Sequence, residues 1–291
     1  MTRKKWQLYL NFCLIAFLAL GVFSLSLKVL ADNSWERFDF SNWHQARKDY
    51  QDEGQTQVEE KQTLQIESGY KLPILMYHYI SLAPKDSALP GLYLDPEIFD
   101  KQLKVINSEA YQSLFMSEVP GIINSQKKNR KYIALTFDDA YEDFYAQAWP
   151  RLKAAKIKST LYVIINKLDQ PGYISRDQLK ELAGSQMVEI ASHTFNHPNL
   201  QNLNEQKAGY EIKASRQVLS ALSGQDLNSF AYPFGLYRAE TLKIVKQAGY
   251  SNAVSTAAGS RQNQNDIFSL KRLRPNSRQG EDFRKWLDSW Q

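Results

Sequence analysis

Hydrophobic and polar positions alternate along most of this chain between short apolar runs and longer amphipathic segments. The apolar runs predict strands, and they lie at residues 72–77, 131–136, 159–165, 187–192, 229–232, 251–255 and 267–273. The amphipathic segments predict helices at residues 95–109, 141–156, 204–222 and 240–248, and one more helix begins at residue 175. Strand-then-helix units at this spacing are typical of an α/β protein with a parallel sheet, either closed into a barrel or doubly wound.

The first part of the chain has a different pattern. A basic start at residues 3–5 precedes an apolar run at 6–30 that has no charge before Lys28. This run is long enough for a helix that spans a bilayer, with the basic end inside the cell. We therefore expect residues 1–31 to be a transmembrane signal-anchor in the cell membrane, which makes the membrane a partner of the chain. A cleaved signal peptide, cut after Ala31, is the alternative and would give a secreted protein.

The segment that follows is polar and rich in Gln, Glu and Asp. We expect residues 32–69 to form an extracellular stalk and residues 70–291 to form one folded catalytic domain, and we expect the protein to be a monomer. Composition narrows the chemistry of that domain. The single cysteine, Cys13, lies in the apolar run, which excludes an intrachain disulfide and a thiol ligand in the domain. The net charge of +5 comes from scattered basic residues, so we expect no nucleic-acid partner.

Two short motifs carry the candidate chemistry. Asp138 and Asp139 follow one predicted strand, whereas His193 and His197 follow another. One aspartate and two histidines suit a divalent metal of the zinc class and leave coordination positions open, and the other aspartate could then act on water as a base. Each motif alone has a plainer interpretation, because acidic pairs cap helices and paired histidines occur in surface loops. Together, at the ends of two strands, they predict a metal hydrolase.

Two further features lie at strand ends. His78 follows the first predicted strand, and it is the histidine of the domain that the metal set leaves free. Hydrolysis of an amide needs an acid for the departing amine, so His78 is the candidate for that role. The segment 230–235 is either a tight turn built from Pro and Gly or a wall of the site whose backbone N–H groups face an oxyanion.

These residues resemble the polysaccharide deacetylases of the carbohydrate esterase 4 family, which contain a NodB homology domain. The resemblance covers about residues 72–273 and rests on the motifs at 136–139, 192–198 and 232–235. It implies that Asp138 is the catalytic base and that Asp139, His193 and His197 hold the metal. It also implies a distorted (β/α)7 barrel and one divalent metal ion, usually Zn²⁺, with Co²⁺, Ni²⁺ or Mn²⁺ accepted by related enzymes. The backbone N–H of Phe234 would help to bind the oxyanion.

The chain departs from the usual family pattern at two places. Ala231 stands where an arginine usually orients the catalytic aspartate, a role that we expect to pass to Arg272 or Arg274. The late segment 269–274 lacks the usual acid histidine. Both departures resemble the branch that includes biofilm poly-β-1,6-N-acetylglucosamine deacetylases and streptococcal wall-polysaccharide deacetylases. An early Tyr-His element is common in that branch, which matches Tyr77-His78 and supports His78 as the acid.

The resemblance leads to a functional hypothesis with two alternatives. We expect an exported N-deacetylase that acts on N-acetylglucosamine in a cell-surface glycan, such as a wall polysaccharide or its linkage unit, peptidoglycan or an exopolysaccharide. An O-deacetylase of an acetylated polymer such as xylan is the first alternative, and an inactive glycan-binding module is the second. The complete metal and base set argues against the second. Aromatic side chains near the site could stack on sugar rings, namely Tyr79, Tyr232, Phe234 and Tyr237.

Overall fold

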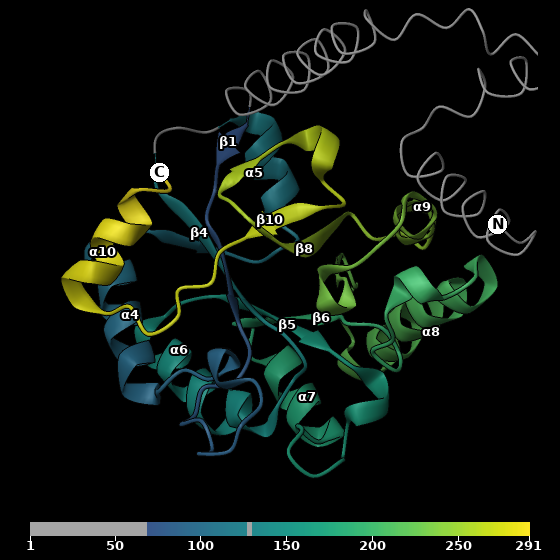
Figure 1. Ribbon diagram of the computed structural model, residues 1–291, viewed down its shortest axis with the longest axis horizontal. Helices are drawn as coiled ribbons and strands as arrows, with labels where there is room; N and C mark the ends of the chain where they lie inside the picture. Colours follow the sequence, from purple (N-terminus) through teal and green to yellow (C-terminus); the bar gives the residue numbers. More distant parts are fainter. Residues whose placement is uncertain (1–68, 127–129) are drawn as a thin grey trace, which may run out of the picture. The chain divides into compact units, whose positions relative to one another are not determined.

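A ring of parallel strands forms the centre of the molecule in the computed structural model, which describes residues 69–126 and 130–291 (Figure 1). Within these residues the ring contains seven strands, and every neighbouring pair along it is parallel. In ring order they are β10 (Leu270–Arg272), β8 (Asn252–Ala258), β7 (Ser229–Ala231), β6 (Val188–Ser192), β5 (Ser159–Val163), β4 (Tyr132–Phe137) and β2 (Ile74–Tyr77). The predicted parallel α/β architecture is therefore confirmed.

The last strand of the chain meets the first strand of the ring and nearly closes the barrel. The backbone N–H of Met76 donates to the carbonyl of Leu273 at 2.9 Å, and the N–H of Leu273 donates to the carbonyl of Ile74 at 2.8 Å. A parallel bridge pairs Leu75 with Leu273 at the same place. Of the two arrangements that the sequence left open, the structure therefore has the barrel rather than the doubly wound sheet.

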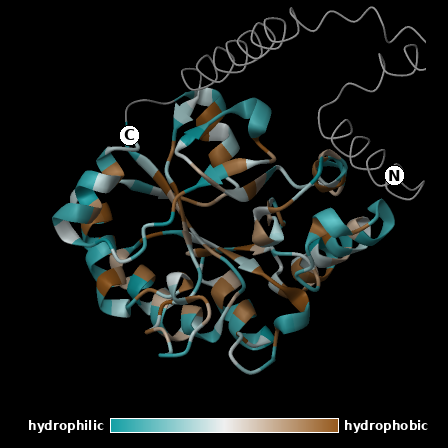
Figure 2. Cartoon of the chain, viewed as in Figure 1, coloured by the Kyte–Doolittle hydropathy of each residue, from teal (hydrophilic) through white to brown (hydrophobic). Residues whose placement is uncertain are grey.

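Helices surround the ring, and their apolar faces turn toward the strands (Figures 1 and 2). They are α4 (Pro96–Ser108), α5 (Val119–Ser125), α6 (Trp149–Ala155), α7 (Arg176–Gly184), α8 (Glu205–Ser223), α9 (Ala239–Gln247) and α10 (Gly280–Asp288). Local sequence sets several of their starts, because polar side chains accept hydrogen bonds from the free N–H groups of a first turn. Asp95 caps α4 and Asn204 caps α8, whereas Ser175 and Gln178 form a reciprocal capping box on α7.

The core has two layers that meet at the strands. On β5, Leu161 and Val163 belong to the layer between strands and helices, whereas Tyr162 belongs to the layer inside the ring. Such alternation is expected when a parallel strand is buried on both faces. Inside the ring, small residues at positions 134, 191 and 231 accompany two large, fully buried side chains, Tyr162 and Arg272.

Two predicted elements differ from the structure. The helix expected over 141–156 is divided into a π-helical turn at Phe144–Ala148 and α6. The physical reason is Pro150, which has no N–H and whose ring clashes with the carbonyl four residues earlier, so that a wider turn precedes it. The strand expected over 267–273 begins only at β10, because residues 267–269 form a turn in which the N–H of Ser269 donates to the carbonyl of Asp266 at 2.7 Å.

Short strands add two smaller pairings at the edge of the barrel. Strand β3 (Gln112–Leu114) pairs in parallel with the start of β4, and β1 (Tyr70–Lys71) pairs antiparallel with β9 (Arg261–Gln262). The anchor predicted for residues 1–31 and the stalk predicted for 32–69 lie outside the described residues, apart from the last position of the stalk. Among the residues that are described, no helix combines the length and the apolar character needed to cross a membrane.

Candidate active site

The candidate catalytic side chains lie at the carboxyl ends of the strands, as the sequence predicts. Asp138 and Asp139 follow β4, His193 follows β6, and His78 follows β2. Loops at this end of a parallel barrel have no strand ladder to continue and are free to carry functional groups. The sheet therefore brings together residues that are far apart in the chain.

The backbone at the site is held in an uncommon conformation. Non-glycine residues adopt the left-handed region at Asp139 (φ 74°), Ala140 (φ 60°), Thr194 (φ 69°), His197 (φ 60°) and Phe234 (φ 60°). Each such residue costs about 1–2 kcal/mol, because the side chain comes close to its own backbone. The three predicted motifs all contain at least one of these positions. The surrounding barrel thus holds strained turns where the candidate ligands are.

Asp139, His193 and His197 converge on one point. Asp139 Oδ1 lies 3.5 Å from His193 Nε2 and 3.5 Å from His197 Nε2, and the two Nε2 atoms are 3.2 Å apart. Among the described residues, Asp139 Oδ1 is buried without a hydrogen-bond partner. Three possible ligand atoms lie within 4.8 Å of one another. A buried, unpaired carboxylate oxygen beside two imidazole nitrogens fits a divalent cation of the zinc class.

The tautomers of the two histidines also suit metal binding. His193 Nδ1 lies 2.8 Å from the carbonyl oxygen of Ala231, so Nδ1–H donates to that oxygen and the lone pair of Nε2 is free. The backbone N–H of His197 donates to Thr194 Oγ1 at 2.8 Å, which fixes the turn between the two histidines. Burial, together with the nearby His193, lowers the pKa of His197 to about 4. Its imidazole is therefore neutral near pH 7, as a ligand must be.

Asp138 forms a two-point ion pair with Arg272. Arg272 Nη1 donates to Oδ1 and Nη2 donates to Oδ2, each at 2.7 Å, and the arginine side chain is fully buried. The guanidinium also donates to the carbonyl of Ser255 at 2.9 Å and to Thr136 Oγ1 at 3.1 Å. Burial alone would raise the pKa of Asp138, but the charge and the hydrogen bonds of Arg272 lower it well below its usual range. Asp138 is therefore a carboxylate at neutral pH.

The Arg272 pair resolves the choice that the sequence left between two arginines. Arg272 points into the barrel and contacts Asp138, whereas Arg274 lies in an exposed position at the mouth. At Ala231, where the family usually has its arginine, the backbone carbonyl instead orients His193. The side chain that neutralises Asp138 comes from β10, which meets β2, the neighbour of β4, where the barrel closes.

His78 lies beside Asp138, near the oxygen that also accepts from Arg272 Nη2. Its Nε2 lies 3.9 Å from Asp138 Oδ2, and its side chain is 12% exposed. Burial lowers the pKa of His78, while the charges of Asp138 and Asp139 raise it. The imidazole thus lies near the carboxylate pair and close to solvent, where it can exchange a proton.

The Phe234 turn forms another wall of the site. Phe234 is in a 3-10 turn at Pro233–Gly235, its side chain is 58% exposed, and its ring centroid lies 4.7 Å from that of His197. Gly235 at φ 72° packs so tightly that an added Cβ would lie 2.1 Å from Thr256 Oγ1. The turn is therefore fixed against β8, which leaves the Phe234 ring directed outward.

Two of the predicted sugar contacts require correction. Tyr232 is 1% exposed, stacks on Tyr237 with ring centroids 4.4 Å apart, and donates its hydroxyl to the carbonyl of Phe268 at 2.9 Å. A ring buried in this way has no face for a sugar. Tyr79 is enclosed between two other rings, with centroid distances of 4.2 Å to Tyr93 and 3.6 Å to Tyr141. Both faces of Tyr79 are therefore covered.

A column of stacked tyrosines at the rim was not anticipated from the sequence. A bridge pairs Tyr79 with Tyr93, another pairs Tyr141 with Tyr173, and the Tyr79–Tyr141 stack joins the two pairs. These residues come from segments that are distant in the chain, so no local pattern reveals the column. It ties the loops after β2, β4 and β5 into one rim beside Asp139.

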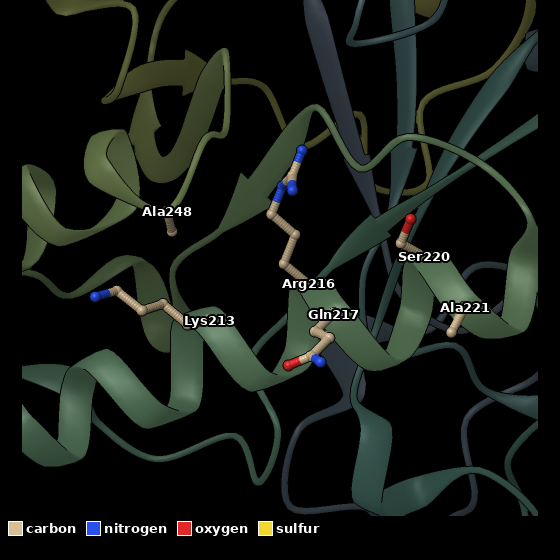
Figure 3. A pocket seen from close by; sticks show the side chains of 6 residues that line it. All are labelled: Lys213, Arg216, Gln217, Ser220, Ala221 and Ala248. Atoms are coloured by element: carbon tan, nitrogen blue, oxygen red, sulfur yellow. The ribbon is translucent and has the colours of Figure 1, made fainter.

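Two hollows accompany these features. A small pocket of about 20 Å³ lies at the mouth of the barrel, and its wall includes His78, Tyr79, Tyr93, Arg274 and Asn276. A larger, open groove of about 460 Å³ runs along α8 and contains none of the candidate catalytic residues (Figure 3). Its lining residues are Lys213, Arg216, Gln217, Ser220, Ala221 and Ala248. The larger hollow is therefore separate from the chemistry described above.

Comparison with known proteins agrees with this geometry. Residues 125–253 match the family model described as polysaccharide deacetylase. The Bacillus subtilis (strain 168) protein YxkH, which is named for this activity, is 30% identical over 228 residues, covering 78% of this chain and 79% of that protein. The poly-beta-1,6-N-acetyl-D-glucosamine N-deacetylase of Staphylococcus aureus (strain MRSA252) is 26% identical over 164 residues, covering 52% of this chain and 57% of that protein.

Solved structures give the same result over the whole barrel. The Streptococcus pyogenes deacetylase PplD in complex with acetate has a TM-score of 0.70 and 30% identity, and the match covers 77% of this chain and 100% of that chain. The Bacillus anthracis polysaccharide deacetylase BA0330 has a TM-score of 0.66 and 27% identity, covering 75% of this chain and 69% of that chain. The chain belongs to the polysaccharide deacetylase family.

Proposed function

We propose that this enzyme is a metal-dependent N-deacetylase that removes acetyl groups from N-acetylglucosamine in a bacterial cell-surface glycan. The observation that carries the proposal is the convergence of Asp139, His193 and His197 beside the Asp138–Arg272 ion pair. The relative from Staphylococcus aureus is named for deacetylation of a polymer of N-acetylglucosamine, which supports this substrate class. Export with an N-terminal membrane anchor is part of the same proposal, because its substrate lies outside the cell.

The metal ligands would be Asp139 Oδ1, His193 Nε2 and His197 Nε2. A divalent cation held by these atoms would supply Lewis-acid polarisation of the acetyl carbonyl and of the attacking water. We propose Zn²⁺ as the native ion, because one carboxylate and two imidazoles suit it, although the same donors accept Co²⁺, Ni²⁺ and Mn²⁺. The contact between His193 Nδ1 and the Ala231 carbonyl keeps the ligand nitrogen directed at the ion.

Asp138 would be the base that takes a proton from the attacking water. Arg272 holds both of its oxygens and keeps it ionised, so that the carboxylate is charged and oriented before substrate binds. A carboxylate with a low pKa accepts a proton only transiently. His78 Nε2, 3.9 Å from Asp138 Oδ2, is placed to take part in the same proton transfer.

His78 would be the acid that protonates the nitrogen of the departing sugar amine. Without a proton the amine is a poor leaving group, and the His78 imidazole, which lies beside Asp138 and close to solvent, can donate a proton and be protonated again. The backbone N–H of Phe234, in its fixed turn, would donate to the oxyanion that forms when water adds to the acetyl carbonyl. The reaction then releases acetate and leaves a glucosamine unit.

The test is release of acetate from purified glycans, measured with and without a chelator. We expect release from poly-β-1,6-N-acetylglucosamine or from N-acetylated wall glycans, its loss with chelator and its return on addition of Zn²⁺. Asp138→Asn should abolish release while metal still binds. Release from O-acetylated xylan but not from any N-acetylated polymer would overturn the substrate class, and full activity after chelation would overturn the metal dependence.

A further inference from the structure

Arg274 lies at the mouth of the barrel, two positions after the arginine that holds the base. It follows the bridge between Leu273 and Leu75, and it forms one wall of the small pocket together with His78 and Asn276. The chain is extended at this bridge, so side chains two residues apart lie on the same face. Arg274 therefore stands above the buried arginine and next to the proposed acid.

The guanidinium of Arg274 has a charge that the protein does not balance. Among residues 69–126 and 130–291, no carboxylate forms an ion pair with Arg274 and no hydrogen bond from its side chain is found. Asp138, whose charge acts on Arg274, is already paired with Arg272 through both of its oxygens. Burial and the repulsion of Arg272 lower the pKa of Arg274, and Asp138 raises it, which agrees with a position close to both. A guanidinium still remains charged at neutral pH.

The position of Arg274 relative to His78 indicates which part of a substrate it would contact. In the proposed mechanism, His78 protonates the nitrogen that stays on the sugar, while the acetyl group lies toward the metal ligands. Arg274 shares the pocket wall with His78, so it faces the sugar side of the scissile bond. This step rests on the proposed function, and specifically on His78 as the acid.

A free guanidinium at such a place recognises carboxylate or phosphate, because its planar donors match two oxygens of either group. We propose that Arg274 selects glycans that carry an anionic group, a carboxylate or a phosphodiester, on or next to the sugar that loses its acetyl group. A neutral polymer of N-acetylglucosamine would reach the same catalytic residues but would leave this charge without a partner.

The experiment compares three oligosaccharides of equal length with the full-length metal-loaded enzyme. One is a neutral β-1,6-linked N-acetylglucosamine oligomer, one has a lactyl carboxylate on alternate sugars, and one carries a phosphodiester. The kcat and KM for acetate release are measured for the wild type, Arg274→Gln, Arg274→Lys and Lys271→Gln. Lys271 is exposed on β10 and is not part of the site, so its variant controls for the loss of one positive charge from the same strand.

We expect the wild type to favour one anionic oligomer over the neutral one, mainly through KM. Arg274→Gln should lower that preference about tenfold or more, the effect of losing one charge-assisted contact, and Arg274→Lys should restore only part of it. Added salt should weaken the preference of the wild type, and Lys271→Gln should keep it. Which anionic oligomer responds identifies carboxylate or phosphodiester as the recognised group.

Two results would overturn the proposal, and they differ from failure of the proposed function. In the first, the wild type treats neutral and anionic oligomers alike. In the second, Arg274→Gln lowers kcat/KM for all three by the same factor, which would make Arg274 a general part of the site. If the wild type releases acetate from none of the three, the proposed function itself fails.

Discussion

Arg272 and Asp138 meet inside the barrel through two hydrogen bonds of 2.7 Å, although 134 residues separate them in the chain. The pair joins the last strand of the ring to the end of β4. Its arginine is also held by the carbonyl of Ser255 and by Thr136 Oγ1. One buried contact therefore links barrel closure to the state of the proposed base.

Replacing Arg272 should affect both stability and activity. Arg272→Met leaves the Asp138 carboxylate buried without a partner, which costs about 3–5 kcal/mol of unfolding free energy. Acetate release should fall with it, because the carboxylate loses its orientation. Denaturant unfolding and acetate release measure the two effects. Adding Asp138→Asn to Arg272→Met should recover stability but not activity, and an Arg272→Met variant as stable as the wild type would contradict the importance of the pair.

Loss of one proposed ligand should remove the stabilisation that a metal ion provides. At a Zn²⁺ concentration about a hundredfold above its Kd, binding adds about 2.7 kcal/mol, or roughly 5–10 °C in melting temperature. His197→Ala should lose most of this shift, whereas His78→Ala should keep it. Thermal unfolding with and without Zn²⁺ makes the comparison. An equal shift in His197→Ala would show that the ion binds elsewhere.

Substitution of His78 should separate proton transfer from metal binding. His78→Gln retains polarity but cannot supply a proton, so kcat should fall about 10²–10⁴-fold while the melting temperature changes little. Acetate release from an oligomer with a poor amine leaving group should be affected most, and an activated ester of acetic acid should be affected least. Full activity of His78→Gln on the glycan would assign the acid to another residue.

Gly235 provides a test of the fixed Phe234 turn. A Cβ at Gly235 would lie 2.1 Å from Thr256 Oγ1 and 2.6 Å from its backbone nitrogen, and φ is 72°. Gly235→Ala should therefore displace the turn and reduce kcat, as well as lower stability. Gly172→Ala is the matched control, because Gly172 has φ 84° but an added Cβ would meet nothing within 4 Å. It should cost only the left-handed strain, about 1–2 kcal/mol, and keep kcat; equal loss of kcat in both variants would refute the argument.

Asp143 should make stability depend on pH. Burial raises the pKa of Asp143 to about 6, although Ser81 Oγ donates to its Oδ2 at 2.7 Å and acts in the opposite direction. Because the pKa is higher in the folded than in the unfolded state, the contribution of Asp143 to stability is fully present below about pH 4 and is lost as the pH rises through 6. The melting temperature of the wild type should therefore fall relative to that of Asp143→Asn across this range.

The Ser81 hydrogen bond gives a control for that prediction. Ser81→Ala removes the donor that favours the charged carboxylate, so the pKa of Asp143 in the folded protein should rise further. The pH-dependent loss of stability should then extend to higher pH than in the wild type. A difference between wild type and Asp143→Asn that stays constant from pH 4 to 8 would refute the assignment.

Much of the fold could be predicted because local signals and periodicity agree with the barrel. The capping box at Ser175 and Gln178 and the cap at Asn204 mark helix starts that the structure confirms. Parallel strands place their carboxyl ends at one edge, so Asp139 and His193 could be expected to meet. Predictions from pattern fail where one residue overrides its segment, as Pro150 does in the helix expected over 141–156.

Contacts between distant segments account for what the sequence could not decide. Arg272 and Arg274 have equal local patterns, and only closure of the barrel determines which of them reaches Asp138. The stacking of Tyr79 on Tyr141 depends in the same way on two loops after different strands. Whether an aromatic ring is exposed likewise depends on the residues packed around it. Tyr232 packs in the core and is therefore not available to contact a sugar.

The position of β10 at the seam of the barrel also has a consequence for the timing of activity. A ribosome completes Asp138, Asp139, His193 and His197 well before it reaches Arg272, so a partly made chain already contains the base and the ligands but not the cation that orders the base. The strand that supplies this cation is also the strand that meets β2. Competence for deacetylation should therefore appear in a single step, together with closure of the ring, rather than build up as the chain lengthens.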